Sequence, residues 1–147
     1  MLAWRICKQS AIDDLSGQGA AAFGGRWNHL DHAAVYLSLS AAGCALDRLI
    51  LGTGAPCPGS CLVQLQLPND PQLYRTPTLD ELPPGWDALP ADRASMDFGS
   101  EWLERHDQLG LIVPSATITH TRNLLLNPRH AAIAQIRVMA VSAFSCA

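Results

Sequence analysis

The segment CLVQLQL, residues 61–67, alternates apolar and polar side chains and is followed by Pro68. Because successive side chains of a strand point to opposite faces, this period of two predicts a half-buried strand. Short apolar segments at 2–7, 35–39, 109–113 and 134–144 predict further strands, the first of them at a sheet edge. Helices are expected only at 40–51 and 95–106. Strands that outnumber helices without regular alternation predict an α+β fold, as opposed to a doubly wound α/β sheet.

The expected helices have local signals of their own. Ser40 is a candidate N-cap for the first helix. Its expected apolar face carries Leu46, Leu49 and Ile50, and the second helix is expected to bury Met96, Trp102 and Leu103. The rest of the chain is expected to be less regular: a loop at 11–23, a loop at 52–60, a surface segment at 69–94, a continuation of a strand at 116–118 beyond Pro114, and a short apolar turn at 123–126.

Length and charge restrict the class of protein. The chain has 147 residues, which favours a single compact domain over 1–147. A net charge of −3 argues against direct nucleic-acid binding, which needs a basic face. No apolar segment approaches the roughly 18 residues of a membrane span, and the N-terminus lacks the apolar core of a signal peptide. We therefore expect a cytoplasmic protein that does not cross a membrane.

The cysteines and histidines do not predict a metal site. The five cysteines are odd in number and widely spaced, unlike a secreted disulfide framework. Cys57 and Cys61 are the only close pair, and no second pair lies at zinc-site spacing. His29 and His32 flank Asp31, but a solvated turn is the favoured interpretation of HLDH. No metal is expected.

A dinucleotide-binding fingerprint is matched only formally. Gly17, Gly19 and Ala22 fit G-x-G-x-x-A, yet the preceding SAIDDLS is no hydrophobic strand. That fingerprint must follow a strand, so we reject the Rossmann interpretation.

The segment FGGRWN, residues 23–28, is a stronger candidate site. Two glycines allow a tight turn and a close approach of a ligand to Arg26. A guanidinium offers a planar fork of donors that matches a phosphate or carboxylate. Alternatively, Arg26 pairs with an acidic side chain and Trp27 fills the core.

Two further polar residues allow two interpretations each. Asp47 stands among apolar residues in ALDRLI, where it either pairs with Arg48 or Arg5 or faces a cleft. Ser115 follows a proline in LIVPS, which is also an ordinary way to end a strand.

Taken together and in order, several strings resemble the RES domain family over nearly the whole chain. WRI carries Arg5, SGQGAAAFGGRWN carries Arg26, and VYLSLSAAGCALDRL carries Tyr36. LIVPSATI carries Ser115, and NLLLNPRH carries Asn127. LQLPND, the LP and tryptophan of residues 82–86, and EWL are also similar to family segments.

One position departs from the family pattern. Asp47 stands where the family carries glutamate, so the carboxylate is kept on a side chain one methylene shorter. A displacement of about 1 Å in a catalytic group can cost roughly a hundredfold in rate.

The resemblance implies a compact α+β domain with mixed or antiparallel strands and an ADP-ribosyltransferase-like fold. It implies a toxin of a bacterial toxin–antitoxin pair, bound in a hetero-oligomer by an Xre-like helix-turn-helix antitoxin to which any DNA binding would belong. NAD is the implied substrate, cleaved between nicotinamide and ribose by hydrolysis or phosphorolysis. The alternatives are transfer of ADP-ribose to a protein, and an attenuated or inactive binding module because of Asp47.

The resemblance also implies roles for individual residues. Asp47 would stabilise an oxocarbenium-like transition state. Arg26 and Arg5 would bind the pyrophosphate, and Tyr36 would border the nicotinamide ring. Ser115 would hydrogen-bond a phosphate or ribose oxygen.

Asn127, in the NLLLNPRH string, completes the expected NAD-binding set.

Overall fold

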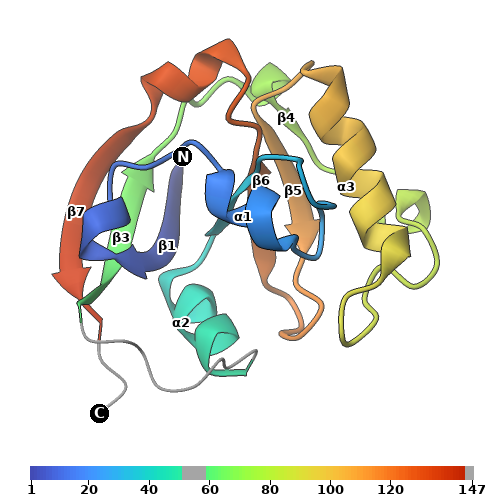
Figure 1. Ribbon diagram of the computed structural model, residues 1–147, viewed down its shortest axis with the longest axis horizontal. Helices are drawn as coiled ribbons and strands as arrows, with labels where there is room; N and C mark the ends of the chain where they lie inside the picture. The colour runs from blue at the N-terminus through green and yellow to red at the C-terminus, as the bar shows by residue number, and fades with distance from the viewer. Residues whose placement is uncertain (51–58, 145–147) are drawn as a thin grey trace.

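The computed structural model describes residues 1–50 and 59–144 (Figure 1). Its strands are β1 (Leu2–Lys8), β2 (Val35–Ser38), β3 (Ser60–Gln66), β4 (Tyr74–Arg75), β5 (Gly110–Pro114), β6 (Arg122–Leu126) and β7 (Arg137–Ala143). They form one sheet in the order β4-β5-β6-β2-β1-β3-β7. All neighbouring pairs are antiparallel except β4 and β5, which run parallel. This mixed sheet confirms the predicted α+β class.

The α-helices of the described residues are α1 (Gln18–Phe23), α2 (Ala41–Ile50) and α3 (Arg93–Arg105). In Figure 1, α3 runs beside β4 and β5, and α2 contacts β1 and β2. Ser40 caps α2 as predicted, since its Oγ accepts the backbone N–H of Gly43 at 3.0 Å. Short 3-10 helices connect the other elements: η1 (Gln9–Ala11), η2 (Pro71–Leu73), η3 (Leu79–Glu81) and η4 (Ala131–Gln135).

The core consists of two apolar clusters, and β6 contributes to both. Leu124 and Leu126 belong to the larger cluster, with residues of β1, β2, β3 and η4. Leu125, which points the other way, belongs to a second cluster with Trp102 and Leu103 of α3. This division follows from the alternation of side chains along a strand. The sheet is therefore buried on both faces where β6 passes through it.

Three predicted strand features are wrong. Segment 123–126 is expected to be a turn but belongs to β6, a strand inside the sheet. Segment 2–7 is expected at an edge, yet β1 lies between β2 and β3. Segment 116–118 does not continue β5, because the Ser115 hydroxyl accepts two later backbone N–H groups and bends the chain. Partner strands are distant in sequence, so local patterns do not reveal them.

The helix predictions need smaller corrections. The segment 11–23, expected to be a loop, contains α1. Leu46 and Leu49 of α2 are 45% and 55% exposed, because α2 turns other residues toward the sheet. Trp102 and Leu103 are buried as predicted, whereas Met96 is half-buried. The predicted loop at 52–60, and Cys57 within it, lie mainly outside the described residues.

No helix among the described residues is long and apolar enough to cross a bilayer.

Candidate active site

A cavity of about 560 Å³ lies beside the point where β1 and β2 separate. Among the described residues these two strands share a single register pair, Trp4 with Ser38. Residues of both strands line the cavity, together with residues of α2, of the loop at 24–27 that carries Arg26, and of the turn after β5. Small-molecule sites typically measure about 300–1,000 Å³. Five predicted site residues line this cavity: Arg5, Arg26, Tyr36, Asp47 and Ser115.

Tyr36 fixes the loop that carries Arg26. Its hydroxyl donates to Asn28 Oδ1 at 2.5 Å and accepts the backbone N–H of Trp27 at 2.9 Å. Burial raises the pKa of Tyr36 above its usual range, so the hydroxyl stays protonated and keeps its donor. The buried amide of Asn28 continues the network to the carbonyls of Ala20, His29 and His32. The loop is thus tied to β2 by side-chain hydrogen bonds.

Gly25 is needed for this arrangement. A Cβ atom at this position would lie 2.6 Å from Tyr36 Oη and 2.8 Å from Asn28 Oδ1. Both distances are shorter than van der Waals contact. The second glycine of the pair therefore makes room for the tyrosine hydroxyl.

Trp27 fills the core, as the simpler interpretation of GGRWN predicts. It is 2% exposed and stacks on Trp86, with the ring centroids 6.2 Å apart. Phe98 of α3 meets the same indole edge-on at 6.1 Å. Such aromatic pairs contribute about 0.5–1.5 kcal/mol beyond area burial.

Arg26 is held by backbone carbonyls. Its Nη1 donates to Trp86 O at 2.9 Å and to Ala88 O at 2.8 Å, and the described residues offer it no ion-pair partner. Burial lowers the pKa of Arg26, while the charges of Asp87 and Asp47 oppose that shift, so the guanidinium stays charged. A guanidinium has five N–H donors, and two are used here. The remaining donors are available to an anion in the cavity.

Arg5 has a similar arrangement on β1. Its Nη2 donates to Ala11 O and to Ile12 O, both at 2.8 Å. Its Nε is buried and has no hydrogen-bond partner among the described residues. A buried donor without a partner is unusual in a folded protein.

Asp47 faces the cleft, which was one of its two predicted placements. Its Oδ1 accepts the Thr117 hydroxyl at 2.7 Å, and its Oδ2 accepts Asn123 Nδ2 at 3.3 Å. Within the described chain it forms no ion pair with Arg48 or Arg5. The sequence did not indicate Thr117 or Asn123, because both were assigned to the wrong local structure. A correct strand at 122–126 would have brought Asn123 beside β2.

Ser115 lies at the end of β5, where its Oγ accepts the N–H groups of Thr117 at 3.2 Å and Ile118 at 3.1 Å. The same oxygen lies 3.2 Å from Thr117 Oγ1. Ser115 therefore ends the strand and also lines the cavity. The strand-ending interpretation is confirmed, and a contact between Ser115 and NAD stays a prediction.

Cys44 of α2 also lines the cavity. Burial, assisted by the neighbouring Asp47 charge, raises the pKa of its thiol to about 11. The thiolate is the nucleophilic form of cysteine, so this side chain is a poor nucleophile at neutral pH.

The structure does not bring Asn127 into the cavity lining. Its side chain is 1% exposed. Nδ2 donates to Leu103 O at 2.9 Å, and Oδ1 accepts the N–H of Arg129 at 3.1 Å. Asn127 links the end of β6 to α3, and its expected contact with NAD is replaced by this structural role.

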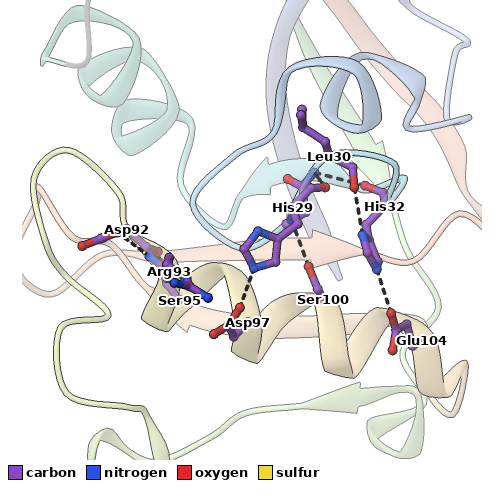
Figure 2. Close-up of polar contacts among 10 residues, drawn as sticks. His29, Leu30, His32, Asp92, Arg93, Ser95, Asp97, Ser100 and Glu104 are labelled. Atoms are coloured by element: carbon purple, nitrogen blue, oxygen red, sulfur yellow. Dashed lines mark hydrogen bonds and ion pairs between the residues drawn. The ribbon is translucent and has the colours of Figure 1, made fainter.

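The HLDH segment docks onto α3, as Figure 2 shows. His29 Nε2 lies 2.5 Å from Asp97 Oδ1, and His32 Nε2 lies 2.8 Å from Glu104 Oε1. The Ser100 hydroxyl accepts the His29 backbone N–H at 2.9 Å. No group of three or more metal-ligating side chains occurs in the part of the chain that the structure describes. These histidines thus hold the loop after Arg26 against the helix.

The comparison with protein-family models decides the family. The model described as RES domain matches residues 2–146. The chain belongs to the RES domain family. This membership confirms the family predicted from GGRWN, VPSA and LNPRH.

Curated RES domain relatives cover most of the chain. A protein of Sphingobium sp. (strain YBL2) named Prs ADP-ribosylating toxin is 39% identical over 132 residues, covering 86% of this chain and 82% of the relative. A protein named Toxin Res from Yersinia enterocolitica (strain NCTC 13174 / 8081) is also 39% identical over 132 residues, covering 88% and 86%.

A solved structure has a similar fold. A chain from the crystal structure of the M. tuberculosis MbcT–MbcA toxin–antitoxin complex superimposes with a TM-score of 0.75 at 20% identity. The match covers 98% of this chain and 84% of the other. At this identity the match supports the fold alone.

Proposed function

We propose that this chain is the toxin of a bacterial toxin–antitoxin pair and cleaves NAD between nicotinamide and ribose. The observation that carries the proposal is one cavity holding the Asp47 carboxylate together with the Arg26 and Arg5 guanidinium groups. A dinucleotide with a cationic ring and an anionic pyrophosphate needs both kinds of charge. The names of the Sphingobium and Yersinia relatives support the toxin assignment.

The chemistry needs a fixed negative charge beside the ribose. When the bond between C1′ and the nicotinamide nitrogen breaks, its electron pair leaves with nicotinamide, which becomes neutral. The ribose then carries oxocarbenium character, as in glycoside cleavage. The Asp47 carboxylate would stabilise that charge without reorganising, since Thr117 and Asn123 already hold its oxygens. Water or phosphate then bonds to C1′, and water gives up its proton to solvent.

The arginines would bind the pyrophosphate. The donors of Arg26 beyond Nη1 are suited to phosphate oxygens, and Arg5 adds a second positive charge to the same cavity lining. The Tyr36 hydroxyl is engaged with Asn28 and Trp27, so its ring is the part available to border nicotinamide. None of these roles needs a metal.

The proposed partner is an Xre-like helix-turn-helix antitoxin that forms a hetero-oligomer with this chain. One chain of the crystallised MbcT–MbcA toxin–antitoxin complex has a similar fold, which supports an antitoxin as the partner. Any DNA contact would belong to the antitoxin, in keeping with the net charge of −3. The site of action would be the cytoplasm, where NAD is present.

The direct test is nicotinamide release from NAD by the purified chain. We expect Asp47→Asn to lower kcat by about 100-fold or more, because a neutral amide cannot balance the oxocarbenium charge. Asp107→Asn, which changes an exposed carboxylate outside the cavity, is the matched control and should leave the rate unchanged. Absence of release by the wild-type chain would refute NAD cleavage to a small-molecule product.

ADP-ribosyl transfer to a protein is the second candidate, favoured by the printed name of the Sphingobium relative. In that reaction a protein side chain replaces water at C1′. NAD labelled in its adenylate would then mark a protein band, whereas hydrolysis or phosphorolysis leaves the label in a small molecule. The presence or absence of a labelled band separates the two candidates.

The attenuated-module alternative is tested by Asp47→Glu. The carboxylate of Asp47 already receives hydrogen bonds from Thr117 and Asn123, and one more methylene would displace it by about 1 Å. We therefore expect Asp47→Glu to lower kcat by about tenfold or more. A clear gain in turnover would instead mean that the aspartate attenuates the enzyme.

A further inference from the structure

The Ser115 hydroxyl has no hydrogen-bonding capacity left for a ligand. A hydroxyl offers one proton and two acceptor lone pairs. Both lone pairs receive backbone N–H groups, from Thr117 at 3.2 Å and from Ile118 at 3.1 Å. The remaining contact, 3.2 Å to Thr117 Oγ1, must therefore use the serine proton. Ser115 donates to Thr117.

Thr117 in turn donates a hydrogen bond to Asp47. Its Oγ1 donates to Asp47 Oδ1 at 2.7 Å. Its single proton is thereby used, so the same oxygen can only accept from Ser115. The hydrogen bonds run in one direction, from Ser115 through Thr117 to the carboxylate. Bonds aligned in this way polarise and strengthen one another.

The second carboxylate oxygen is held from a different element. Asn123 Nδ2 donates to Asp47 Oδ2 at 3.3 Å. Asn123 lies in β6, opposite Val113 of β5 and opposite Ser38 of β2. The strand pairing on both sides fixes its backbone. A carboxylate accepts about four hydrogen bonds, so two sites stay available for a substrate hydroxyl.

We propose that Thr117 and Asn123 are positioning residues for Asp47, and that Ser115 acts through Thr117 without touching NAD. The proposal rests on the proposed NAD-cleaving function of this cavity. It replaces the expected contact between Ser115 and a phosphate or ribose oxygen. A carboxylate held at both oxygens keeps its position while positive charge develops on the ribose. Such a preorganised group lowers the activation barrier because it does not have to rearrange in the transition state.

The kinetic test compares Thr117→Val with Thr117→Ser. Valine keeps the shape and removes the hydroxyl, so we expect kcat for nicotinamide release to fall by about 10- to 100-fold. The KM for NAD should stay within about threefold, and Thr117→Ser should restore most of kcat. Thr121→Val is the matched control, because its hydroxyl lies in the same turn and donates to Ile118 O at 2.9 Å.

Ser115→Ala separates the relay from direct binding. If Ser115 acts through Thr117, kcat should fall by about 3- to 10-fold while KM is unchanged. A raised KM with unchanged kcat would mean that Ser115 binds NAD and would overturn the proposal. Asn123→Ala should also lower kcat at constant KM.

A spectroscopic measurement keeps this proposal separate from the proposed function. In protein labelled with ¹³C at aspartate, the resonance of the Asp47 carboxyl carbon should move in Thr117→Val and stay in place in Thr121→Val. This result does not depend on turnover. If the wild type releases no nicotinamide, the proposed NAD-cleaving function is refuted. The Asp47 carboxyl resonance still tests the hydrogen bonds from Thr117. An unmoved resonance in Thr117→Val would overturn the positioning role.

Discussion

At the scale of single residues, the position of Arg26 depends on a contact between Gly25 and Tyr36. The tyrosine hydroxyl bonds both Asn28 and Trp27, and it approaches the glycine too closely for any side chain. The arginine is thus oriented by a strand residue that follows it in the sequence. The backbone of the Arg26 loop is therefore hydrogen-bonded directly to Tyr36 in the wall of the cavity.

We expect Gly25→Ala to lower the free energy of unfolding by about 2 kcal/mol, in the range of overpacking substitutions. The added methyl would meet Tyr36 Oη at 2.6 Å. For a chain of this length the shift corresponds to about 5 °C in Tm, measured by calorimetry. Gly19→Ala is the control, because a Cβ there meets nothing within 4 Å, and alanine in α1 should be neutral or stabilising. Equal Tm values for the two variants would contradict the close-packing argument.

At the scale of elements, α3 anchors the segment after Arg26. Gly99 lets the helix approach the loop so closely that a Cβ would lie 1.9 Å from Trp27 O. The His29–Asp97 and His32–Glu104 pairs then hold the next turn of chain (Figure 2). The arginine loop is therefore fixed on one side by β2 and on the other by α3.

The His32–Glu104 pair makes this anchoring depend on pH. The hydrogen bond to Glu104 raises the pKa of His32 in the folded protein. The stabilisation of the folded protein by this pair is therefore complete below the ordinary histidine pKa of about 6.5. It is lost as the pH rises through the raised pKa of His32 in the folded state. Since the pair is partly exposed, His32→Gln should lower Tm by about 1–3 °C near pH 6 and by less near pH 9.

Glu101→Gln provides the comparison for that pH dependence. It removes the Glu101–Arg105 pair from the same helix, and that pair contains no histidine. The effect of Glu101→Gln on Tm should therefore be the same near pH 6 and near pH 9. A pH-independent effect of His32→Gln would contradict the role of its protonation.

At the scale of the whole molecule, β6 connects the two halves of the core. Leu124 and Leu126 face the cluster formed with β1, β2 and β3, and Leu125 faces α3. The same strand contains Asn123, whose side-chain amide donates a hydrogen bond to Asp47. Folding of the core and assembly of the candidate site therefore depend on the same strand pairing.

We expect Leu124→Ala to lower the free energy of unfolding by about 3 kcal/mol, because a fully buried leucine leaves a cavity. Met139→Ala in the edge strand β7 is the control. That methionine is 56% exposed, so its loss should change stability by less than about 0.5 kcal/mol. Urea titrations of both variants provide the measurement. A similar midpoint for the two would mean that β6 is not a core strand in solution.

The sequence alone determined the class of fold, the family and five of the residues that line the cavity. The alternation in 61–67 identified β3, and Ser40 identified the start of α2. Arg26 and Asp47 were indicated by local signals, a pair of glycines and a charge inside an apolar segment, whereas Tyr36 was indicated by the resemblance to the RES domain family.

Tertiary structure alone decided which of these residues act on one another. Thr117 and Asn123 reach Asp47 across 70 and 76 residues of sequence, and no local pattern encodes a contact at that separation. Asn127 matched a family string, yet its amide is used between β6 and α3. Periodicity reports which side of a strand is buried, whereas a hydrogen bond depends on which strands pair and in what register. The pairing of β6 with β2 and β5 sets that register, and with it the surroundings of the Asp47 carboxylate.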